Sequence, residues 1–313
     1  MLTDVRRLIL IAAIALLAAG CGDDPTGGER PVSAIATTPH VADLTRNVGG
    51  GRVDVRVLVP AGADPHGYEP RPSDARAIAG ADLIVRSGGE VDEWLDDLLA
   101  SAGGETVELT LIDKVRVVDG DPHWWKDPRN AVRAVAAIGD VLSRADPAGR
   151  EQYERNAARY SRRLRELDRS IAACLARVPA ERRKLVTPHD SYGYFATRYG
   201  IEVVGALIPS RSTQAQPSAK DTVELAERIE REGALAIFPE TASSSRLERA
   251  VAREAGVRLG TRLLGDSLGP AGSAGETYIG AMAADAAAMA EGFSGGRVRC
   301  RPDTRRAASR RGR

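Results

Sequence analysis

Three of the four histidines in this 313-residue chain lie in proline-containing loops that could present an imidazole to a ligand. His66 and His123 each end an Asp-Pro-His sequence, and His189 ends a Thr-Pro-His sequence. Proline keeps the residue before it extended, which fixes the path of the chain into each histidine. One such histidine alone would be an ordinary loop residue that makes a hydrogen bond. Three together indicate a metal site, because imidazole is the commonest metal ligand in proteins.

A carboxylate from the last quarter of the chain would complete such a site. Asp266 is the candidate, because Gly265 and Gly269 bracket it in a loop that follows a short apolar run. The alternative, that Asp266 caps the next helical turn, fits the spacing equally well. Successive candidates are 57, 66 and 77 residues apart, so each ligand would come from a loop of its own.

Three imidazoles and one carboxylate fit more than one kind of protein. A hydrolytic enzyme could use a zinc ion held in this way to activate water. Against an enzyme, the sequence has no His-Glu-x-x-His pair, and no obvious general base accompanies the histidines. The fourth protein ligand would also fill the position that a catalytic water needs. A carrier that binds one ion without turnover fits better, and a lipid-anchored adhesin is the alternative that needs no metal.

The elements that must position these loops alternate between short β-rich runs and helical patterns. Predicted strands lie at residues 33–37, 53–59, 83–86, 184–187, 202–208 and 235–238. Predicted helices lie at residues 74–79, 93–102, 128–144, 220–231 and 245–255. This alternation is typical of α/β units with parallel sheets, and here it occurs twice. The predicted fold class is therefore α/β, with two similar lobes, each a mainly parallel sheet flanked by helices.

The longest helical signal lies between the two sets of strands. It opens at Asp146 and Pro147, as N-cap and first-turn proline, and closes before Pro179. Its apolar or aromatic positions step by four and three residues along one face: Tyr153, Ala157, Tyr160, Leu164, Leu167, Ile171, Cys174 and Val178. About 30 residues make a rod of roughly 45 Å, long enough to run along both lobes. A coiled-coil dimer is the alternative, but two lobes of one chain could bury this face without a partner. The chain then divides into an N-terminal lobe at 32–145, a connecting helix at 146–179 and a C-terminal lobe at 180–296.

The two halves repeat each other in the order of their motifs. The Thr-Pro-His sequence that ends at His40 leads through a predicted helix to Gly49 and precedes Pro60 by 20 residues. The one that ends at His189 leads through a predicted helix to Gly200 and precedes Pro209 by the same number. Each half then continues to a Pro-Ser pair. Two similar α/β lobes enclose a cleft, and ligands of open α/β sheets bind beyond the carboxyl ends of the strands. The candidate loops fall at those ends.

Composition and charge exclude several classes of protein. The chain is 43% hydrophobic, enough to bury a sizeable core, which excludes disordered and fibrous proteins. The formal charge is only +1, but residues 297–313 hold eight arginines against one aspartate, so the body of the chain is acidic. An acidic body argues against nucleic acid as a partner of the folded part. We expect a monomer.

The N-terminus predicts export from the cytoplasm. Arg6 and Arg7 precede an apolar run of about ten residues, which is typical of a secretory leader and too short for a bilayer-spanning stop-transfer helix. Residues 17–21 resemble a bacterial lipobox, whose cysteine, here Cys21, is lipidated after cleavage. Residues 1–20 are then the signal peptide, and residues 21–31 a flexible tether to the membrane. An ordinary signal peptide or a buried apolar helix is the alternative.

Two further cysteines, Cys174 and Cys300, would then lie outside the cytoplasm. An oxidising compartment favours a disulfide between them. The alternative is one buried thiol and one exposed thiol in the basic tail, which spans residues 297–313. We expect the tail beyond Arg301 to be too charged to pack.

From about residue 35 to residue 293 the sequence resembles the zinc- and manganese-binding lipoproteins that deliver metal to bacterial ABC importers. The motifs that carry the resemblance are Asp-Pro-His-Gly-Tyr-Glu-Pro at 64–70, Asp-Pro-His at 121–123, His-Asp-Ser-Tyr-Gly-Tyr-Phe-Ala at 189–196, Phe-Pro-Glu at 238–240, and Gly-Asp at 265–266 followed by Thr-Tyr at 277–278. The resemblance implies metal ligands at His66, His123, His189 and Asp266. It also implies a rigid helix between the lobes, and delivery of metal to a permease and ATPase complex rather than catalysis.

Zinc is the expected cargo, because three imidazoles and one carboxylate make a nitrogen-rich site. In the family that the sequence resembles, manganese-selective members replace the third histidine with glutamate, whereas this chain has His189. Mn²⁺ or Fe²⁺ is the alternative, since intrinsic affinity favours zinc whatever the physiological metal is. The chain lacks the long His-rich loop of many zinc-specific members. His40 stands where the family has no ligand, and we expect it at the rim of the cleft.

Overall fold

The computed structural model describes residues 30–102, 106–242 and 245–304, and the residues from Val32 onward form one compact unit. The predicted signal peptide, Cys21 and most of the tether lie outside the described residues, as does the tail beyond residue 304. Within the described part of the chain, no helix has both the length and the apolar character needed to cross a membrane.

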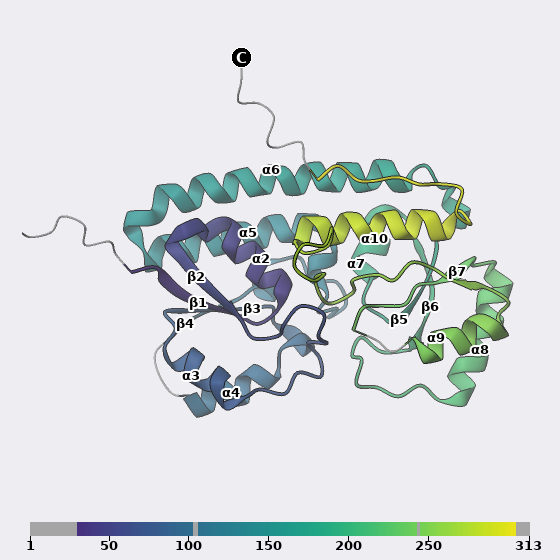
Figure 1. Ribbon diagram of the computed structural model, residues 1–313, viewed down its shortest axis with the longest axis horizontal. Helices are drawn as coiled ribbons and strands as arrows, with labels where there is room; N and C mark the ends of the chain where they lie inside the picture. The colour runs from purple at the N-terminus through teal and green to yellow at the C-terminus, as the bar shows by residue number, and fades with distance from the viewer. Residues whose placement is uncertain (1–29, 103–105, 243–244, 305–313) are drawn as a thin grey trace, which may run out of the picture. The chain divides into compact units, whose positions relative to one another are not determined.

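The N-terminal half is built on a parallel four-stranded sheet with the strand order β2-β1-β3-β4 (Figure 1). The strands are β1 (Val32–Ala36), β2 (Val53–Val57), β3 (Leu83–Arg86) and β4 (Val107–Thr110). The helices are α2 (Pro39–Gly49), α3 (Pro72–Ala79), α4 (Trp94–Ala102) and α5 (Pro128–Ala145). The central strands β1 and β3 are almost wholly buried. This is expected where helices cover both faces of a parallel sheet.

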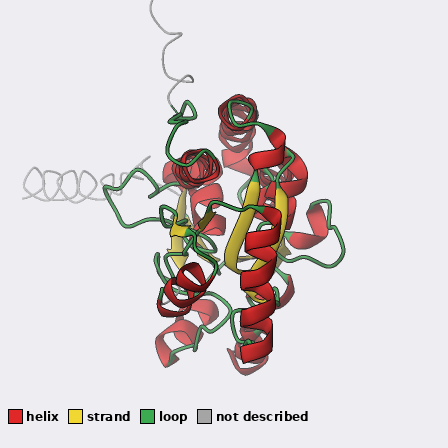
Figure 2. Cartoon of the chain, turned by 90° about the vertical axis from the view of Figure 1, so that its right-hand side faces the viewer, coloured by secondary structure: helices red, strands yellow, loops and turns green. Residues whose placement is uncertain are grey.

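The C-terminal half repeats this topology. Its strands are β5 (Lys184–His189), β6 (Glu202–Ile208), β7 (Ala236–Ile237) and β8 (Arg258–Leu259), which pair as β5-β6 and β7-β8, all parallel. The Phe238 amide donates to the Val186 carbonyl at 2.9 Å and joins the two pairs. The order β6-β5-β7-β8 therefore matches β2-β1-β3-β4. The helices are α7 (Gly193–Tyr199), α8 (Ala219–Glu232), α9 (Arg246–Glu254) and α10 (Tyr278–Phe293), and helices lie on both sides of the strands (Figure 2).

One long helix, α6 (Arg150–Leu175), runs alongside both halves and packs against α2, α5 and α10 (Figure 1). It is shorter than predicted, about 39 Å rather than 45 Å, because residues Pro147–Gly149 form a tighter 3-10 turn and the helix ends at Leu175, before the predicted end at Pro179. Asp146 accepts a hydrogen bond from the Gly149 amide in that turn at 3.1 Å. The predicted apolar face is buried at Tyr153, Tyr160, Leu164, Leu167, Ile171 and Cys174. The predicted α/β fold class is confirmed.

Three elements were not predicted from the sequence. Strands β4 and β8 are short, and β4 exposes two of its four residues, so neither has a clear apolar pattern. Helix α10 is buried on nearly every side and is rich in alanine, methionine and glycine. A helix that is apolar all round shows no helical periodicity in its sequence. Its position under α6 therefore had to come from the structure.

Cys174 and Cys300 form a disulfide in the structure, with their Cα atoms 5.6 Å apart. The segment around Cys300 follows α6: the Arg299 carbonyl accepts from Arg177 at 3.0 Å, and the Asp303 amide donates to Ser170 Oγ at 2.6 Å. Contacts with α6 thus continue two residues past Arg301, where we expected packing to end. The disulfide holds this part of the tail close to α6 despite the positive charge of the tail.

We predict that a Cys21→Ser variant, which removes the third cysteine, shows no reactive thiol when it is denatured without reductant. Reduction should expose two thiols and lower the free energy of unfolding by about 2 to 5 kcal/mol, because the bridge closes a 126-residue segment. Thiol titration and denaturant unfolding measure the two effects. Two reactive thiols before reduction would contradict the bridge.

Candidate metal centre

The four candidate ligands from the sequence lie together in the structure. One atom each of His66, His123, His189 and Asp266 lies within 4.8 Å of the others. His66 belongs to the loop after β2, His123 to the segment before α5, His189 to the end of β5 and Asp266 to the loop before α10. Each half of the molecule therefore contributes two side chains.

The distances in this cluster are close to those of a coordination shell. Asp266 Oδ2 lies 2.8 Å from His189 Nε2, 3.3 Å from His66 Nε2 and 3.6 Å from His123 Nε2. The Nε2 atoms of His66 and His123 are 3.3 Å apart. A tetrahedral zinc ion with ligands at about 2.0 to 2.1 Å separates them by about 3.3 Å. The cluster could accept such an ion with small movements of the side chains.

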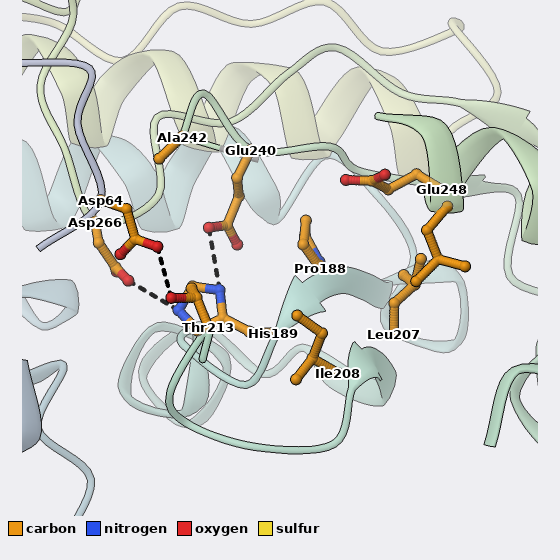
Figure 3. Close-up of a pocket in the computed structure, with 11 residues that line it drawn as sticks. Asp64, Pro188, His189, Leu207, Ile208, Thr213, Glu240, Ala242, Glu248 and Asp266 are labelled. Carbon is orange, nitrogen blue, oxygen red and sulfur yellow. Dashed lines mark hydrogen bonds and ion pairs between the residues drawn. The ribbon is translucent and has the colours of Figure 1, made fainter. Parts of the chain in front are cut away.

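Two buried carboxylates orient two of the three imidazoles from behind. Asp121 Oδ1 accepts a hydrogen bond from the His123 amide at 2.9 Å and lies 2.7 Å from His123 Nδ1. Glu240 Oε2 lies 3.3 Å from His189 Nδ1, an ion-pair distance without the alignment of a hydrogen bond, on the side of the ring opposite Asp266 (Figure 3). A carboxylate at Nδ1 places the proton there and leaves Nε2 free for a metal. The geometry therefore favours coordination through Nε2 by both histidines.

The side chains of the cluster are 0 to 3% exposed, so the charge of each one strongly affects the pKa of its neighbours. Burial alone would lower the pKa of His123 and of His189. For His123, Asp266 and Asp121 outweigh burial and raise the pKa above its ordinary value. For His189, Glu240 and Asp266 do the same, and its pKa lies well above the ordinary value. Burial would raise the pKa of Asp266, but His123 and His189 hold it well below its usual range.

The loop that carries His66 is tied to the rest of the molecule by its backbone and by Asp64. Asp64 Oδ1 accepts from the His66 amide at 3.0 Å, and Asp64 Oδ2 accepts from Thr213 Oγ1 at 2.6 Å. Trp94 Nε1 donates to the Pro65 carbonyl at 3.1 Å. Within the described residues, His66 Nδ1 is buried without a hydrogen-bond partner. Among the described residues, carboxylates lie within ion-pair distance of Nδ1 in His123 and His189, whereas the carboxylate near His66 faces its Nε2.

The loop that carries Asp266 is anchored on both sides of the carboxylate. The Leu264 amide donates to Asp285 Oδ1 at 2.8 Å, and Ser267 Oγ accepts from the Gly62 amide at 2.6 Å. Gly265 has a φ of +63°, and a Cβ there would lie 2.5 Å from Glu240 Oε2. The helix that follows Asp266 is α10, which begins at Tyr278 and has Thr277 as its N-cap. The alternative that Asp266 is a helix cap does not fit this arrangement.

A cavity of about 230 Å³ opens onto His189 and Asp266 (Figure 3). Its lining includes three further carboxylates, from Asp64, Glu240 and Glu248, and no lysine or arginine. Thr213 and apolar side chains complete the wall. A cavity lined in this way attracts cations and repels anions.

His40 is buried, so our expectation that it lies at the rim of the cleft was wrong. It is only 3% exposed and lies outside the four-residue cluster. Its ring stacks on Trp125 with centroids 5.3 Å apart. Burial, helped by the charge of Lys126, lowers the pKa of His40 to about 3, so the ring is neutral.

Sequence reasoning did not assign the supporting residues around the cluster. The signal for Asp121 was present, since it stands two residues before His123 in the Asp-Pro-His motif and can reach the same ring. Glu240 ends the Phe-Pro-Glu motif, but nothing in that motif indicates which histidine it would approach, and Lys126 had no local signal. Glu240 is 51 residues from His189, and the Gly265 carbonyl that Lys126 contacts is 139 residues away from it.

Comparison with known proteins agrees with this fold. The sequence model of a family described as zinc-uptake complex component A, periplasmic (ZnuA), matches residues 35–292. The manganese-binding lipoprotein MntA of Halalkalibacterium halodurans is 31% identical over 294 residues, which cover 91% of this chain and 97% of that protein. The manganese ABC transporter substrate-binding lipoprotein PsaA of Streptococcus pneumoniae is 27% identical over 302 residues, with 92% and 97% covered.

Solved structures give the same result. The periplasmic zinc-binding protein TroA from Treponema pallidum has a TM-score of 0.80 and 27% identity, over 84% of this chain and 99% of that one. A cadmium-bound periplasmic metal-binding protein from Candidatus Liberibacter asiaticus has a TM-score of 0.76 and 25% identity, over 83% and 99%. Since the family model spans most of the sequence and these relatives match along nearly their whole length, this chain belongs to the ZnuA family of periplasmic metal-uptake components.

Proposed function

We propose that this protein captures one Zn²⁺ ion outside the cytoplasm and delivers it to the permease and ATPase complex of an ABC importer. The observation that carries the proposal is the convergence of three imidazoles and one carboxylate in a buried cluster with near-tetrahedral spacing. In this proposal, His66, His123, His189 and Asp266 are the ligands. Residues 32–145 and 180–296 are the two lobes, residues 146–179 connect them, and the metal lies between them.

The ligand set supports zinc, because three nitrogen donors and one oxygen donor suit Zn²⁺ better than the harder Mn²⁺. Mn²⁺ is the second candidate. It is favoured by the names of the relatives MntA and PsaA, both described as manganese proteins. TroA, described as a zinc-binding protein, supports the first candidate.

A lipid on Cys21 would hold the protein at the outer face of the membrane, as the lipoprotein names of its relatives suggest. The proposal excludes hydrolysis by the bound metal. Four protein ligands leave no position for a catalytic water, and the relatives are described as transport components. An adhesin role would not explain a buried cluster of metal-binding side chains.

Substitution of a ligand should abolish tight metal binding, whereas substitution of His40, the buried histidine outside the cluster, should not. We predict that His123→Ala weakens zinc affinity at least 100-fold, on the order of what loss of an inner ligand costs. His40→Gln, the matched control, should stay within about threefold of the wild type. Competition titration against a chelator of known affinity measures both. Binding of more than one ion per chain, or undiminished affinity in His123→Ala, would rule out this ligand set.

Direct competition between the two metals should favour zinc. At equal free concentrations, we predict that Zn²⁺ displaces Mn²⁺ completely from the wild-type protein. The His189→Glu substitution should reduce the difference in affinity between the two metals, because it exchanges a nitrogen donor for an oxygen donor. Equilibrium dialysis followed by elemental analysis gives the ratio of the bound metals. An unchanged ratio in His189→Glu would show that this residue does not determine the choice.

Metal affinity should depend on pH already near neutrality. The pKa values of His123 and His189 are raised in the metal-free protein, and a metal must displace their protons. Affinity should therefore fall as the pH drops, starting above the ordinary histidine pKa of about 6.5. Asp266 stays ionised throughout, since its pKa is lowered. Isothermal titration in buffers of different ionisation enthalpy would count the released protons, and a flat profile between about pH 7.5 and 5.5 would contradict imidazole coordination.

A further inference from the structure

Lys126 is a buried cation next to a candidate site for a cation. It ends the 3-10 turn Trp124–Lys126 that directly follows His123, and it is 1% exposed. A buried ammonium group is costly unless partners in the protein replace its water. It would also repel a metal ion nearby. These two costs indicate that the contacts of the Lys126 ammonium group have a specific role.

The two direct contacts described for the Lys126 ammonium group are both with the C-terminal half. Its Nζ donates a hydrogen bond to the Gly265 carbonyl and lies 4.0 Å from the centre of the Tyr192 ring. Tyr192 OH in turn donates to Asp285 Oδ2 at 2.8 Å, and Asp285 is 3% exposed. Lys126 and Asp285 thus form the two charged ends of a buried network, with the face of Tyr192 as a further favourable contact for the ammonium group.

This network holds the two residues immediately before Asp266. Asp285 Oδ1 accepts from the Leu264 amide at 2.8 Å, and Lys126 binds the Gly265 carbonyl. Gly265 is in the left-handed region, where glycine gives the backbone great conformational freedom. Because a glycine loses more conformational freedom on folding than any other residue, a glycine directly before a ligand gains from an external anchor that has the carboxylate in place before the metal arrives.

We propose that Lys126 is a positioning residue that fixes Asp266 for coordination by holding the Gly265 carbonyl. Because Lys126 follows His123 by three residues, it couples the place of the fourth ligand to that of the second across the two halves. The inference rests on the proposed function, since it concerns the same ligand set. It adds a residue with no metal-binding atom of its own to the determinants of affinity and coordination number.

A merely structural role would be a cross-brace between the two halves. Tyr278 offers a matched control for that role, because it is fully buried and its OH donates to the Trp125 carbonyl at 2.6 Å. This contact also joins the segment after His123 to the C-terminal half, but its acceptor is the Trp125 carbonyl rather than a group in the loop of Asp266. Tyr278→Phe removes one hydrogen bond of the brace and leaves Lys126 in place.

The test compares Lys126→Met with Tyr278→Phe in the full-length mature protein, using Co²⁺ as a spectroscopic probe and Zn²⁺ for affinity. We expect Lys126→Met to weaken zinc binding about 10- to 100-fold, the usual effect of residues that support ligands. The visible absorption of bound Co²⁺ should also lose intensity, because a loosened Asp266 lets more than one water reach the metal, which raises the coordination number above four. Tyr278→Phe should keep the wild-type spectrum and affinity. Lys126→Arg, which retains donors, should lie closer to the wild type than Lys126→Met.

A double variant guards against misfolding as an explanation. If Lys126→Met does not fold, Lys126→Met combined with Asp285→Asn removes both charges of the buried pair and should show the same loss of affinity and of Co²⁺ absorption. Wild-type affinity and spectrum in the variant that folds would overturn the role of Lys126, as would equal losses in Tyr278→Phe. A wild-type protein that binds no metal would instead overturn the proposed function, and this inference with it.

Discussion

One buried carboxylate, that of Asp266, connects the two halves of the molecule. It lies between 2.8 and 3.6 Å from the Nε2 atoms of three imidazoles, two of which come from the other half. Burial alone would raise the pKa of Asp266, but His123 and His189 lower it, and Asp266 in turn raises the pKa of both histidines. Without metal, the carboxylate favours protonation of His123 and His189, whose pKa values it raises. A divalent cation can replace those protons, so capture of metal is an exchange of one kind of positive charge for another.

The rest of the structure keeps these four side chains within coordination distance. Parallel strands bring the loops to one end of each sheet, and α6 runs alongside both halves and fixes their spacing. Behind the ligands, Asp121 and Glu240 orient two imidazoles, and Lys126 and Asp285 hold the loop of Asp266. Such outer contacts reduce the ordering that binding requires, which increases affinity without adding ligands. The protein is therefore largely prepared for metal before metal is present.

Sequence predicted the parts of this arrangement that have local patterns. The alternation of strands and helices, the repeated Thr-Pro-His motif and the apolar face of α6 each recur at regular spacing, so the fold class and the repeat could be inferred. Helix α10 could not, because a helix buried on nearly every side has no apolar period. His40 was misplaced, since its burial depends on Trp125, 85 residues away in the sequence. Lys126 was missed for the same reason, because its partners lie in the other half of the chain.

The most direct measurement is anomalous diffraction at the zinc absorption edge, from crystals of protein loaded with one equivalent of Zn²⁺. The proposed site predicts a single strong peak per chain, about 2.0 to 2.2 Å from the Nε2 atoms of His66, His123 and His189 and from a carboxylate oxygen of Asp266. The positions of Lys126 and Gly265 should be the same as without metal. A peak outside this cluster, or a zinc ion bound by carboxylates alone, would contradict the proposal.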